Sequence, residues 1–260
     1  MDKPFFSIVT VCYNSEKTIS NTLDSVLAQN FIDYEYIIVD GGSTDKTLDI
    51  IKSYELKFGG RMKWKSEPDK GIYDAFNKGC KIANGLYIWI VNSDDYIETN
   101  VLATINNIVS RYKTQDYPII SGALNFRGYD GKILRISKSS AEKAKIAYDK
   151  GWMGIVHPAT LVPKSVYEIV GYYDDSFKIS GDTDWFHRAY SMNMKFLFID
   201  DIITNMNDGG ISNQIRYKIL EADYSRFAKK KYPNVFVRAL KYMIWNKRLV
   251  INILKKGRPY

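Results

Sequence analysis

The feature that most constrains this sequence is the run from Leu86 to Tyr96, which reads LYIWIVNSDDY. Its first half is apolar and rich in β-branched and aromatic side chains. A continuous run of this kind favours a strand that is buried on both faces of a parallel sheet. We therefore expect a central strand from Tyr87 to Asn92 in an α/β fold.

Two acidic residues, Asp94 and Asp95, follow this strand at once. In open α/β sheets, ligands bind just outside the carboxyl ends of the strands. Adjacent carboxylates repel each other unless a cation or a donor-rich ligand lies between them. The pair therefore predicts a site for a divalent metal and a phosphate-bearing ligand. The alternative is that both residues only cap the next helix, expected near residues 99–111.

Segments typical of strands and helices alternate as far as Arg111. Such alternation implies a parallel, doubly wound sheet with right-handed crossovers. The Gly-Gly pair at 41–42 frees the backbone before the second helix, and the Ser-Thr-Asp that follows supplies its N-cap. Strands are expected at 5–12, 34–39 and 62–66, and helices at 18–29, 45–57 and 72–83.

Beyond Arg111 strands and helices no longer alternate regularly. The residues Tyr-Asp-Gly-Lys at 129–132 predict the turn of a β-hairpin within 125–137. Further strands are expected at 117–121 and 195–199, and further helices at 139–150, 163–170, 185–192 and 216–231.

The basic charge of the chain is concentrated at its C-terminal end. The sequence has 37 Lys and Arg against 29 Asp and Glu, a net charge of +8. Residues 226–260 hold 11 of these basic residues and no acidic residue, so residues 1–225 are slightly acidic. This distribution argues against a body that grips nucleic acid and predicts a tail that meets something anionic.

Within that tail, residues 235–256 are predicted to form an amphipathic helix. Basic residues gather on one side and large apolar residues on the other, with Lys247 among the apolar ones. The two sides are Arg238, Lys241, Arg248, Lys255 and Lys256, and Phe236, Leu240, Met243, Val250 and Leu254. Such a helix is typical of a segment on an anionic membrane surface, here 233–256. The alternative is a helix packed on the body or on a second copy, with a solvated basic face.

The sequence lacks the motifs of several common classes of protein. The turn after the first strand has neither GxGxxG nor GxxxxGK[ST], the fingerprints of dinucleotide-binding and P-loop proteins. Cys12 and Cys80 fit no disulfide or metal pattern, which favours a reduced, cytosolic setting. The first residues do not resemble a signal peptide, and no stretch of about 20 residues is apolar enough to span a bilayer.

Further polar residues lie at strand ends or helix starts, where a side chain can either contact a ligand or cap a helix. Asp40 ends the second strand, where a doubly wound sheet faces the base or ribose of a nucleotide. Asp69-Lys70-Gly71 precedes a helix whose N-terminus is a ready anion site, or forms an ordinary turn. Asp182 and Asp184 open another helix, where one is a general base or both are only favoured by the helix dipole.

Two other segments have two interpretations each. His157 is either a satisfied core residue or a contact to a ligand, and with only one further histidine a His-based zinc site is disfavoured. The segment Gly209-Gly210-Ile211-Ser212 is either a loop that closes over a ligand or a plain connection.

Taken together, six stretches in this order resemble the family 2 glycosyltransferases, the GT-A fold enzymes of bacterial polysaccharide synthesis. They are SIVTVCYN at 7–14, YIIVDGGSTDKT at 36–47, EPDKGIYDAFNKG at 67–79, YIWIVNSDD at 87–95, HPATLV at 157–162 and SGDTDWFHRA at 180–189. The resemblance spans about residues 5–215. It implies a Rossmann-like, doubly wound and mainly parallel sheet in a domain of residues 1–225, followed by the helical tail 226–260. A nucleotide-sugar-binding half would occupy about 1–100 and an acceptor-binding half about 115–215.

The resemblance also implies roles for single residues. In this family the donor nucleotide is held after the first strand and by the Asp that ends the second. The matching positions, with the two residues beside them, are Thr10, Tyr13, Asn14, Glu16, Asp40, Asp69 and Lys70.

The family's DxD motif corresponds to Asn92-Ser93-Asp94, in which Asn replaces the first Asp. Asp94 is then the principal ligand for Mg²⁺ or Mn²⁺, and Asp95 lies close to donor or acceptor.

The catalytic base of the family matches Asp182, here preceded by Gly181 instead of Glu, with Asp184 as second candidate. His157, Gly210 and Ser212 are assigned to the acceptor site or the closing loop.

The implied reaction moves a sugar, with inversion, from a nucleoside-diphosphate sugar to a hydroxyl of a saccharide or lipid-diphosphate-linked acceptor. UDP is the favoured nucleotide. The expected setting is cytoplasmic, peripheral at the inner face of the plasma membrane, in O-antigen, capsule or exopolysaccharide synthesis. Two other classes stay open. A sugar nucleotidyltransferase should have a Gly-rich, basic loop after the first strand, and 13–16 is not one. The other is a non-catalytic, membrane-associated nucleotide-sugar-binding protein.

Overall fold

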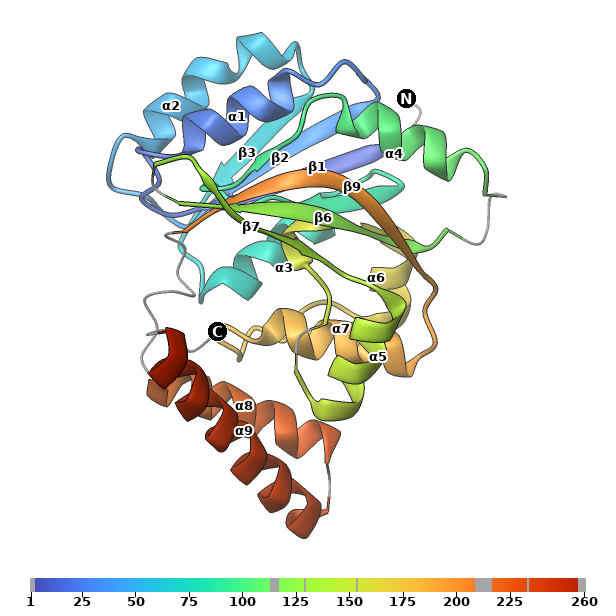
Figure 1. The fold of residues 1–260 in the computed structure, drawn as a ribbon. Coiled ribbons are helices and arrows are strands. Elements are labelled where there is room, and N and C mark those ends of the chain that lie inside the picture. Colours follow the sequence, from blue (N-terminus) through green and yellow to red (C-terminus); the bar gives the residue numbers. More distant parts are fainter. Residues whose placement is uncertain are drawn as a thin grey trace.

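The computed structural model describes residues 3–112, 117–128, 130–152, 154–208, 217–232 and 234–256. Within these ranges, nine strands form one sheet with helices on both faces (Figure 1). The strand order is β3-β2-β1-β4-β8-β6-β9-β5, and β7 pairs with β6 beside this path.

The first half of the chain builds the parallel part of the sheet, as predicted. Strand β1 pairs in parallel with both β2 and β4, and β2 pairs in parallel with β3. The elements are β1 (Phe6–Cys12), α1 (Ile19–Leu27), β2 (Tyr34–Asp40), α2 (Thr47–Tyr54), a 3₁₀ turn (Leu56–Phe58), β3 (Met62–Ser66), α3 (Ile72–Ile82) and β4 (Tyr87–Ile90).

The second half adds mostly antiparallel pairs, so the sheet is mixed rather than mainly parallel. Strands β8 and β4, β6 and β8, β6 and β7, and β5 and β9 are antiparallel, whereas β6 and β9 are parallel. The elements are β5 (Tyr96–Ile97), α4 (Val101–Val109), β6 (Ile119–Arg127), β7 (Ile133–Lys138), α5 (Ala141–Lys150), a 3₁₀ turn (His157–Ala159), β8 (Thr160–Pro163), α6 (Lys164–Val170), α7 (Gly181–Ser191) and β9 (Phe196–Asn207).

Two apolar clusters, one on each face of the sheet, form the core. Helices α1, α2 and α4 pack on one face, and α3, α5, α6 and α7 cover the other (Figure 1). Every residue of β4 is buried, which confirms the prediction of a strand buried on both faces. Trp89 in this strand has no exposed surface.

The central strand ends earlier than predicted, at Ile90, because the chain turns after it. The amide of Asp95 donates to the carbonyl of Asn92 at 3.1 Å, which closes this turn. Strand β5 then intervenes before α4, whose N-cap is Asn100. The prediction that Asp94 and Asp95 only cap this helix is therefore wrong.

Other element boundaries also differ from the predictions. Helix α2 begins at Thr47 after the N-cap Lys46. Ser43 and Thr44 bond to Asn14 in the loop after β1, whereas Asp45 accepts both from the amide of Glu16 at 3.1 Å and from the amide of Thr47 at 3.0 Å. Helix α7 begins at residue 181 rather than 185, and β9 extends to 207 rather than 199.

The C-terminal residues form α8 (Tyr217–Lys231) and α9 (Val235–Lys256), drawn in red in Figure 1. The predicted domain boundary between 225 and 226 falls inside α8, whose Phe227 belongs to the core. Helix α9 has the predicted bounds and packs on α8, where the rings of Trp245 and Tyr224 stack at 4.4 Å. None of the helices in the described ranges is long and apolar enough to cross a membrane.

Candidate active site

The site is built where the carboxyl ends of β1, β2 and β4 meet. The hydroxyls of Ser15 and Ser93 lie 2.8 Å apart and join the loop after β1 to the turn after β4. The side-chain carbonyl of Asn14 accepts from the amide of Thr44 at 2.9 Å, and the amide of Asn14 donates to Ser43 Oγ at 2.8 Å. The three loops therefore support one another, as expected for neighbouring parallel strands.

Asp40 holds the glycine-rich loop after β2. Its Oδ2 accepts from the amides of Gly42 and Ser43 at 3.0 and 2.9 Å and from Ser66 Oγ at 2.7 Å. Burial opposes its ionisation, but the hydrogen bonds from Ser43 and Ser66 hold the pKa of Asp40 below its ordinary value. Burial, and after it the negative charge of Asp40, raises the pKa of the adjacent Cys12 thiol. Asp40 is thus an ionised carboxylate that shapes the loop.

The loop before α3 lies against this same loop. A Cβ on Gly41 would collide with the carboxylate of Asp69 and touch the ring of Tyr13. The side chains of Tyr13 and Asp69 therefore meet over Gly41, and 62% of Tyr13 is exposed. Lys70 is exposed beside them. Three of the residues predicted to face a nucleotide thus lie together with at least partly exposed side chains: Tyr13, Asp69 and Lys70. Asp40, the fourth, has no exposed surface and supports this loop through its hydrogen bonds.

Two other predicted nucleotide contacts have different surroundings. Thr10 has no exposed surface, and its hydroxyl accepts from Tyr36 at 3.0 Å inside the core. It therefore supports β1 from within and cannot touch a ligand. The carboxylate of Glu16 accepts from the amide of Lys46 at 3.1 Å, which ties the loop after β1 to the start of α2.

The turn after β4 contains two carboxylates that are destabilised when ionised. Burial raises the pKa of Asp94, and burial together with the charge of Asp94 raises that of Asp95. The amide of Asn92 donates to Asp95 Oδ2 at 3.3 Å. The Oδ1 atoms of Asn92 and Asp95 are both buried and have no partner among the described residues.

These oxygens suit a divalent cation that a substrate helps to bind. No group of three or more His, Cys, Asp or Glu side chains that would form a complete protein site occurs in the described ranges. Mg²⁺, however, is usually bound by one or two carboxylates together with waters and substrate phosphates. The donors of Asp94, Asp95 and Asn92 are the carboxylate and amide oxygens that such an ion prefers, so the turn fits it.

Asp182 lies in the first turn of α7 and is partly exposed. Its Oδ1 accepts from the amide of Thr183 at 2.7 Å and lies 3.4 Å from the hydroxyl of Tyr73. Desolvation raises the pKa of Asp182 from 3.8 to about 6. A carboxylate whose pKa is close to neutral is well suited to accept a proton.

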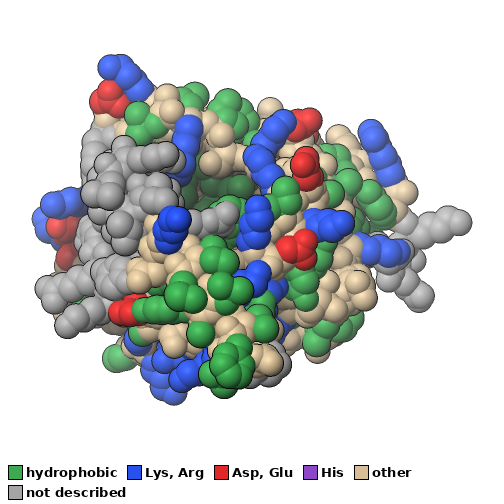
Figure 2. All heavy atoms as spheres, turned by 60° about the horizontal axis from the view of Figure 1, so that its bottom comes forward, with side chains coloured by type: hydrophobic (Ala, Val, Ile, Leu, Met, Phe, Trp, Pro, Cys, Tyr) green, Lys and Arg blue, Asp and Glu red, His purple; other side chains and the backbone are tan. Residues whose placement is uncertain are grey.

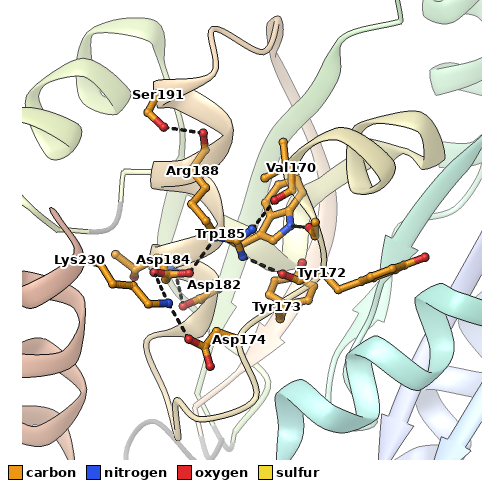
Figure 3. Close-up of polar contacts among 12 residues, drawn as sticks. Val170, Tyr172, Tyr173, Asp174, Asp182, Asp184, Trp185, Arg188, Ser191 and Lys230 are labelled. Atoms are coloured by element: carbon orange, nitrogen blue, oxygen red, sulfur yellow. Dashed lines mark hydrogen bonds and ion pairs between the residues drawn. The ribbon is translucent and has the colours of Figure 1, made fainter.

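Asp184 is fixed in a network of ion pairs (Figure 3). It is 3% exposed, and its two carboxylate oxygens lie 3.0 Å from Arg188 Nε and 3.1 Å from Lys230 Nζ. Lys230 also pairs with Asp174 at 2.6 Å. Asp184 therefore joins α7 to α8, and it has no free oxygen with which to act as a base.

His157 lies in the core, as its alternative interpretation holds. It is 8% exposed, packs against the rings of Phe76 and Phe186, and its Nε2 lies 3.1 Å from the hydroxyl of Tyr173. Desolvation lowers its pKa to about 4, so the ring is neutral. An acceptor cannot reach it directly. Gly210 and Ser212, the predicted closing loop, lie outside the described residues.

Three further residues of this region are not among the site residues predicted from the sequence. The amide of Asn207 donates to the carbonyl of Asp94 at 2.6 Å, and Asp223 contacts the segment before α7. Tyr73 is 4% exposed, and a Cβ on Gly181 would lie 2.8 Å from its ring. Tyr73 thus fills the space beside position 181. Its place in the first turn of α3, just after the Asp69-Lys70-Gly71 loop, was the only signal in the sequence.

Comparison with known proteins identifies the family of this chain. The profile of the family described as Glycosyl transferase family 2 matches residues 7–169. A PGL/p-HBAD biosynthesis glycosyltransferase of Mycobacterium tuberculosis is 28% identical over 226 residues, which cover 83% of this chain and 82% of that protein. A dolichyl N-acetyl-alpha-D-glucosaminyl phosphate 3-beta-D-2,3-diacetamido-2,3-dideoxy-beta-D-glucuronosyltransferase of Methanococcus voltae is 36% identical over 149 residues, or 55% of this chain and 44% of that protein.

Solved structures show the same fold. S. aureus TarS in complex with UDP-GlcNAc has a TM-score of 0.64 and 21% identity over 86% of this chain and 66% of that chain. The mannosyltransferase PcManGT from Pyrobaculum calidifontis, solved with GDP-Man and Mn²⁺, has a TM-score of 0.58 and 15% identity over 90% and 66%. The chain spans only 39% of a longer TarS chain. With a GT-A-like fold and a family profile that covers more than half of its residues, this chain belongs to glycosyltransferase family 2 and is a glycosyltransferase enzyme.

Proposed function

We propose that this enzyme moves a sugar from a UDP-sugar to a hydroxyl of a saccharide or lipid-linked saccharide, with inversion of the anomeric centre, in cell-surface polysaccharide synthesis. The observation that carries the proposal is the position of α3. Its leading loop brings Asp69 against the loop that Asp40 holds, and its first turn brings Tyr73 to Asp182. A donor bound over the first group therefore lies near a carboxylate suited to receive a proton.

The nature of the substrates is supported by the relatives. TarS was solved with UDP and with UDP-GlcNAc, whereas the Pyrobaculum enzyme was solved with GDP-Man. The complexes of TarS with UDP and with UDP-GlcNAc support a UDP-sugar as the donor. The name of the Methanococcus voltae relative describes transfer to a sugar on a dolichyl phosphate, which supports a lipid-linked acceptor.

The proposed mechanism is a single displacement. When bound at Asp94, Asp95 and Asn92, Mg²⁺ or Mn²⁺ supplies positive charge for the leaving diphosphate. Asp182 accepts the proton of the acceptor hydroxyl as its oxygen attacks the anomeric carbon from the face opposite the diphosphate. The carbon–oxygen bond to the diphosphate breaks as the new glycosidic bond forms. The loops around Asp40 and Asp69 orient the donor for this attack.

The experiment is an assay of UDP release from UDP-glucose, UDP-galactose and UDP-GlcNAc in the presence of Mn²⁺. For the best donor we expect Asp182→Asn to lower turnover by at least about 100-fold, the usual scale for a general base. Donor affinity should stay unchanged, because the hydrogen bonds of Asp182 go to Tyr73 and Thr183 and not to the loops proposed to hold the donor. The control is Asp184→Asn, which should act on stability. Near-normal turnover of the Asp182 variant would reject the proposed base.

We further propose that the enzyme works peripherally at the inner face of the plasma membrane, with α9 lying on the anionic surface. The helix packs on α8 through the side that carries Tyr242 and Trp245. Its opposite side exposes large apolar residues: Phe236, Leu240, Met243 and Ile244. Helix α9 therefore packs on the body, as in the alternative prediction, but its exposed side carries large apolar residues, whereas Arg238 and Lys241 are partly buried.

Charge supports a lipid occupant for this apolar face. No acidic residue occurs from 226 to 260. Figure 2 brings this end of the molecule forward and shows lysine and arginine side chains among exposed hydrophobic ones. Exposed apolar residues that insert between headgroups, with cations beside them, are the features of an interfacial helix. Each basic side chain near an anionic surface contributes roughly 1 kcal/mol.

A further inference from the structure

Helix α8 places a buried carboxylate, Asp223, against the segment that leads into α7. Asp223 is 1% exposed. Its Oδ2 accepts hydrogen bonds from the amides of Lys178, Ile179 and Ser180 at 3.0, 2.6 and 3.0 Å. Three consecutive backbone donors therefore converge on one side chain that comes from a different element.

This convergence fixes the backbone directly before Gly181 and Asp182. Three successive amides point at one atom only while the segment 178–180 keeps a single conformation. Hydrogen bonds to an ionised acceptor are roughly twice as strong as neutral ones. A buried carboxylate that loses its donors is strongly destabilised. Movement of the segment is therefore resisted by the same group that holds it.

The other side of the segment is held by α3 and its leading loop. The hydroxyl of Tyr73 donates to the carbonyl of Ile179, and Lys178 Nζ donates to the carbonyl of Lys70 at 3.1 Å. The same Tyr73 hydroxyl lies 3.4 Å from Asp182 Oδ1. The segment is thus clamped between α8 and the N-terminal end of α3.

We propose that Asp223 is a positioning residue for the transfer reaction, which holds the segment 178–180 so that Asp182 faces the acceptor. The inference rests on the proposed role of Asp182 as the base. Asp223 touches no reacting atom and acts through the backbone that carries Asp182. Helix α8 therefore contributes to the active site by supplying Asp223.

The first variant is Asp223→Asn, which keeps the shape of the side chain but replaces one accepting oxygen with an amide group that cannot accept. We expect kcat for UDP release from the best of the three UDP-sugars with Mn²⁺ to fall by about 10- to 100-fold, the cost of a small misplacement. The KM for the donor should change by less than about twofold, since Asp40 and Asp69, which are proposed to hold the donor, make their hydrogen bonds outside the segment 178–180.

The matched control is Asp174→Asn. It removes a different contact of α8, the ion pair of Asp174 with Lys230, and leaves the three amide contacts of Asp223 in place. We expect kcat close to that of the wild type. If this control lowers kcat as much as the Asp223 variant, general loosening of α8 is the cause and the proposal is overturned.

A double variant separates positioning from independent damage. Because Asp223 acts through Asp182, adding Asp223→Asn to Asp182→Asn should cost no further activity. If the activity losses of the two single variants multiply in the double variant, the proposal is overturned. Normal turnover of Asp182→Asn alone rejects the proposed base. Normal turnover of Asp223→Asn beside an inactive Asp182→Asn overturns only the positioning role.

Hydrogen exchange of the wild-type protein gives a test that needs no variant. The amides of Lys178, Ile179 and Ser180 should exchange far more slowly than the amides of an exposed loop, because they are released only when the segment separates from Asp223. Exchange at the rate of an exposed loop would contradict the proposal, even if the Asp223 variant failed to fold.

Discussion

At the scale of single residues, the turn after β4 shows why the sequence places two acids side by side. Ionised Asp94 and Asp95 repel each other, and burial adds to the cost, so the pKa of each carboxyl is raised. A structural role would favour residues without this cost. A ligand that brought positive charge to the turn would remove this cost, as the proposed Mg²⁺ or Mn²⁺ would.

Metal-dependent donor binding should therefore depend on Asp94. We expect Asp94→Ala to abolish the gain in UDP affinity that Mn²⁺ gives the wild type, as measured by calorimetry with and without the metal. The control is Asp201→Ala, which removes an exposed carboxylate from β9. Unchanged Mn²⁺-dependent affinity in the Asp94 variant would argue that the cation binds elsewhere.

Asp182 should also make stability depend on pH. Its pKa is raised to about 6, so between its ordinary value of 3.8 and about 6 the folded protein binds more protons than the unfolded chain. The free energy of unfolding therefore falls as pH rises through this window. We expect Asp182→Asn to raise the Tm relative to the wild type at pH 8 and to lose this advantage at pH 4. An equal Tm difference at both values would show that the carboxyl is not perturbed.

At the scale of elements, the packing of α9 on its neighbour decides which of its two faces is exposed. The amphipathic pattern marks two faces but not which one is free. Helix α8 offers aromatic rings, and Tyr224 stacks on Trp245 while its hydroxyl donates to the carbonyl of Lys241 at 3.1 Å. This contact directs the apolar face of α9 outwards, and that face needs a partner.

Vesicle sedimentation tests the membrane role of α9. We expect the enzyme to pellet with vesicles that contain phosphatidylglycerol, and both deletion of 233–260 and the double variant Phe236→Ser, Leu240→Ser to weaken this binding. The control is Ile32→Ser, Leu56→Ser, which removes exposed apolar side chains elsewhere on the surface. If the truncated form pellets as well as the full chain, the helix is not the anchor. A change of oligomeric state without a change in vesicle binding would assign the face to a second copy.

At the scale of the whole molecule, the active site depends on contacts between distant parts of the chain. Tyr73 and Asp182 are 109 residues apart, and Ser15 and Ser93 are 78 apart. Strand β8 comes late in the chain yet lies between β4 and β6, and it joins the parallel half to the mixed half. The sheet thereby brings together the loops proposed to hold the donor and the proposed base, Asp182.

The sequence by itself determined the strands β1 to β4, their parallel order and the bounds of α9. Apolar periodicity and turn residues act over a few positions, so these elements can be predicted from local pattern. It also placed Asp94 and Asp182 in the correct kind of position, at a strand end and at a helix start.

Only the tertiary structure decided which polar groups are free to act. Asp184 has nearly the same sequence position as Asp182, at the start of the same helix. Its carboxylate, however, forms ion pairs with Arg188 of α7 and Lys230 of α8. Thr10 belongs to a recognisable motif but lies inside the core, and nothing in the local pattern marks Asp223. Whether a carboxylate is solvated, paired or buried depends on neighbours that are distant along the chain, and the sheet topology brings those neighbours together.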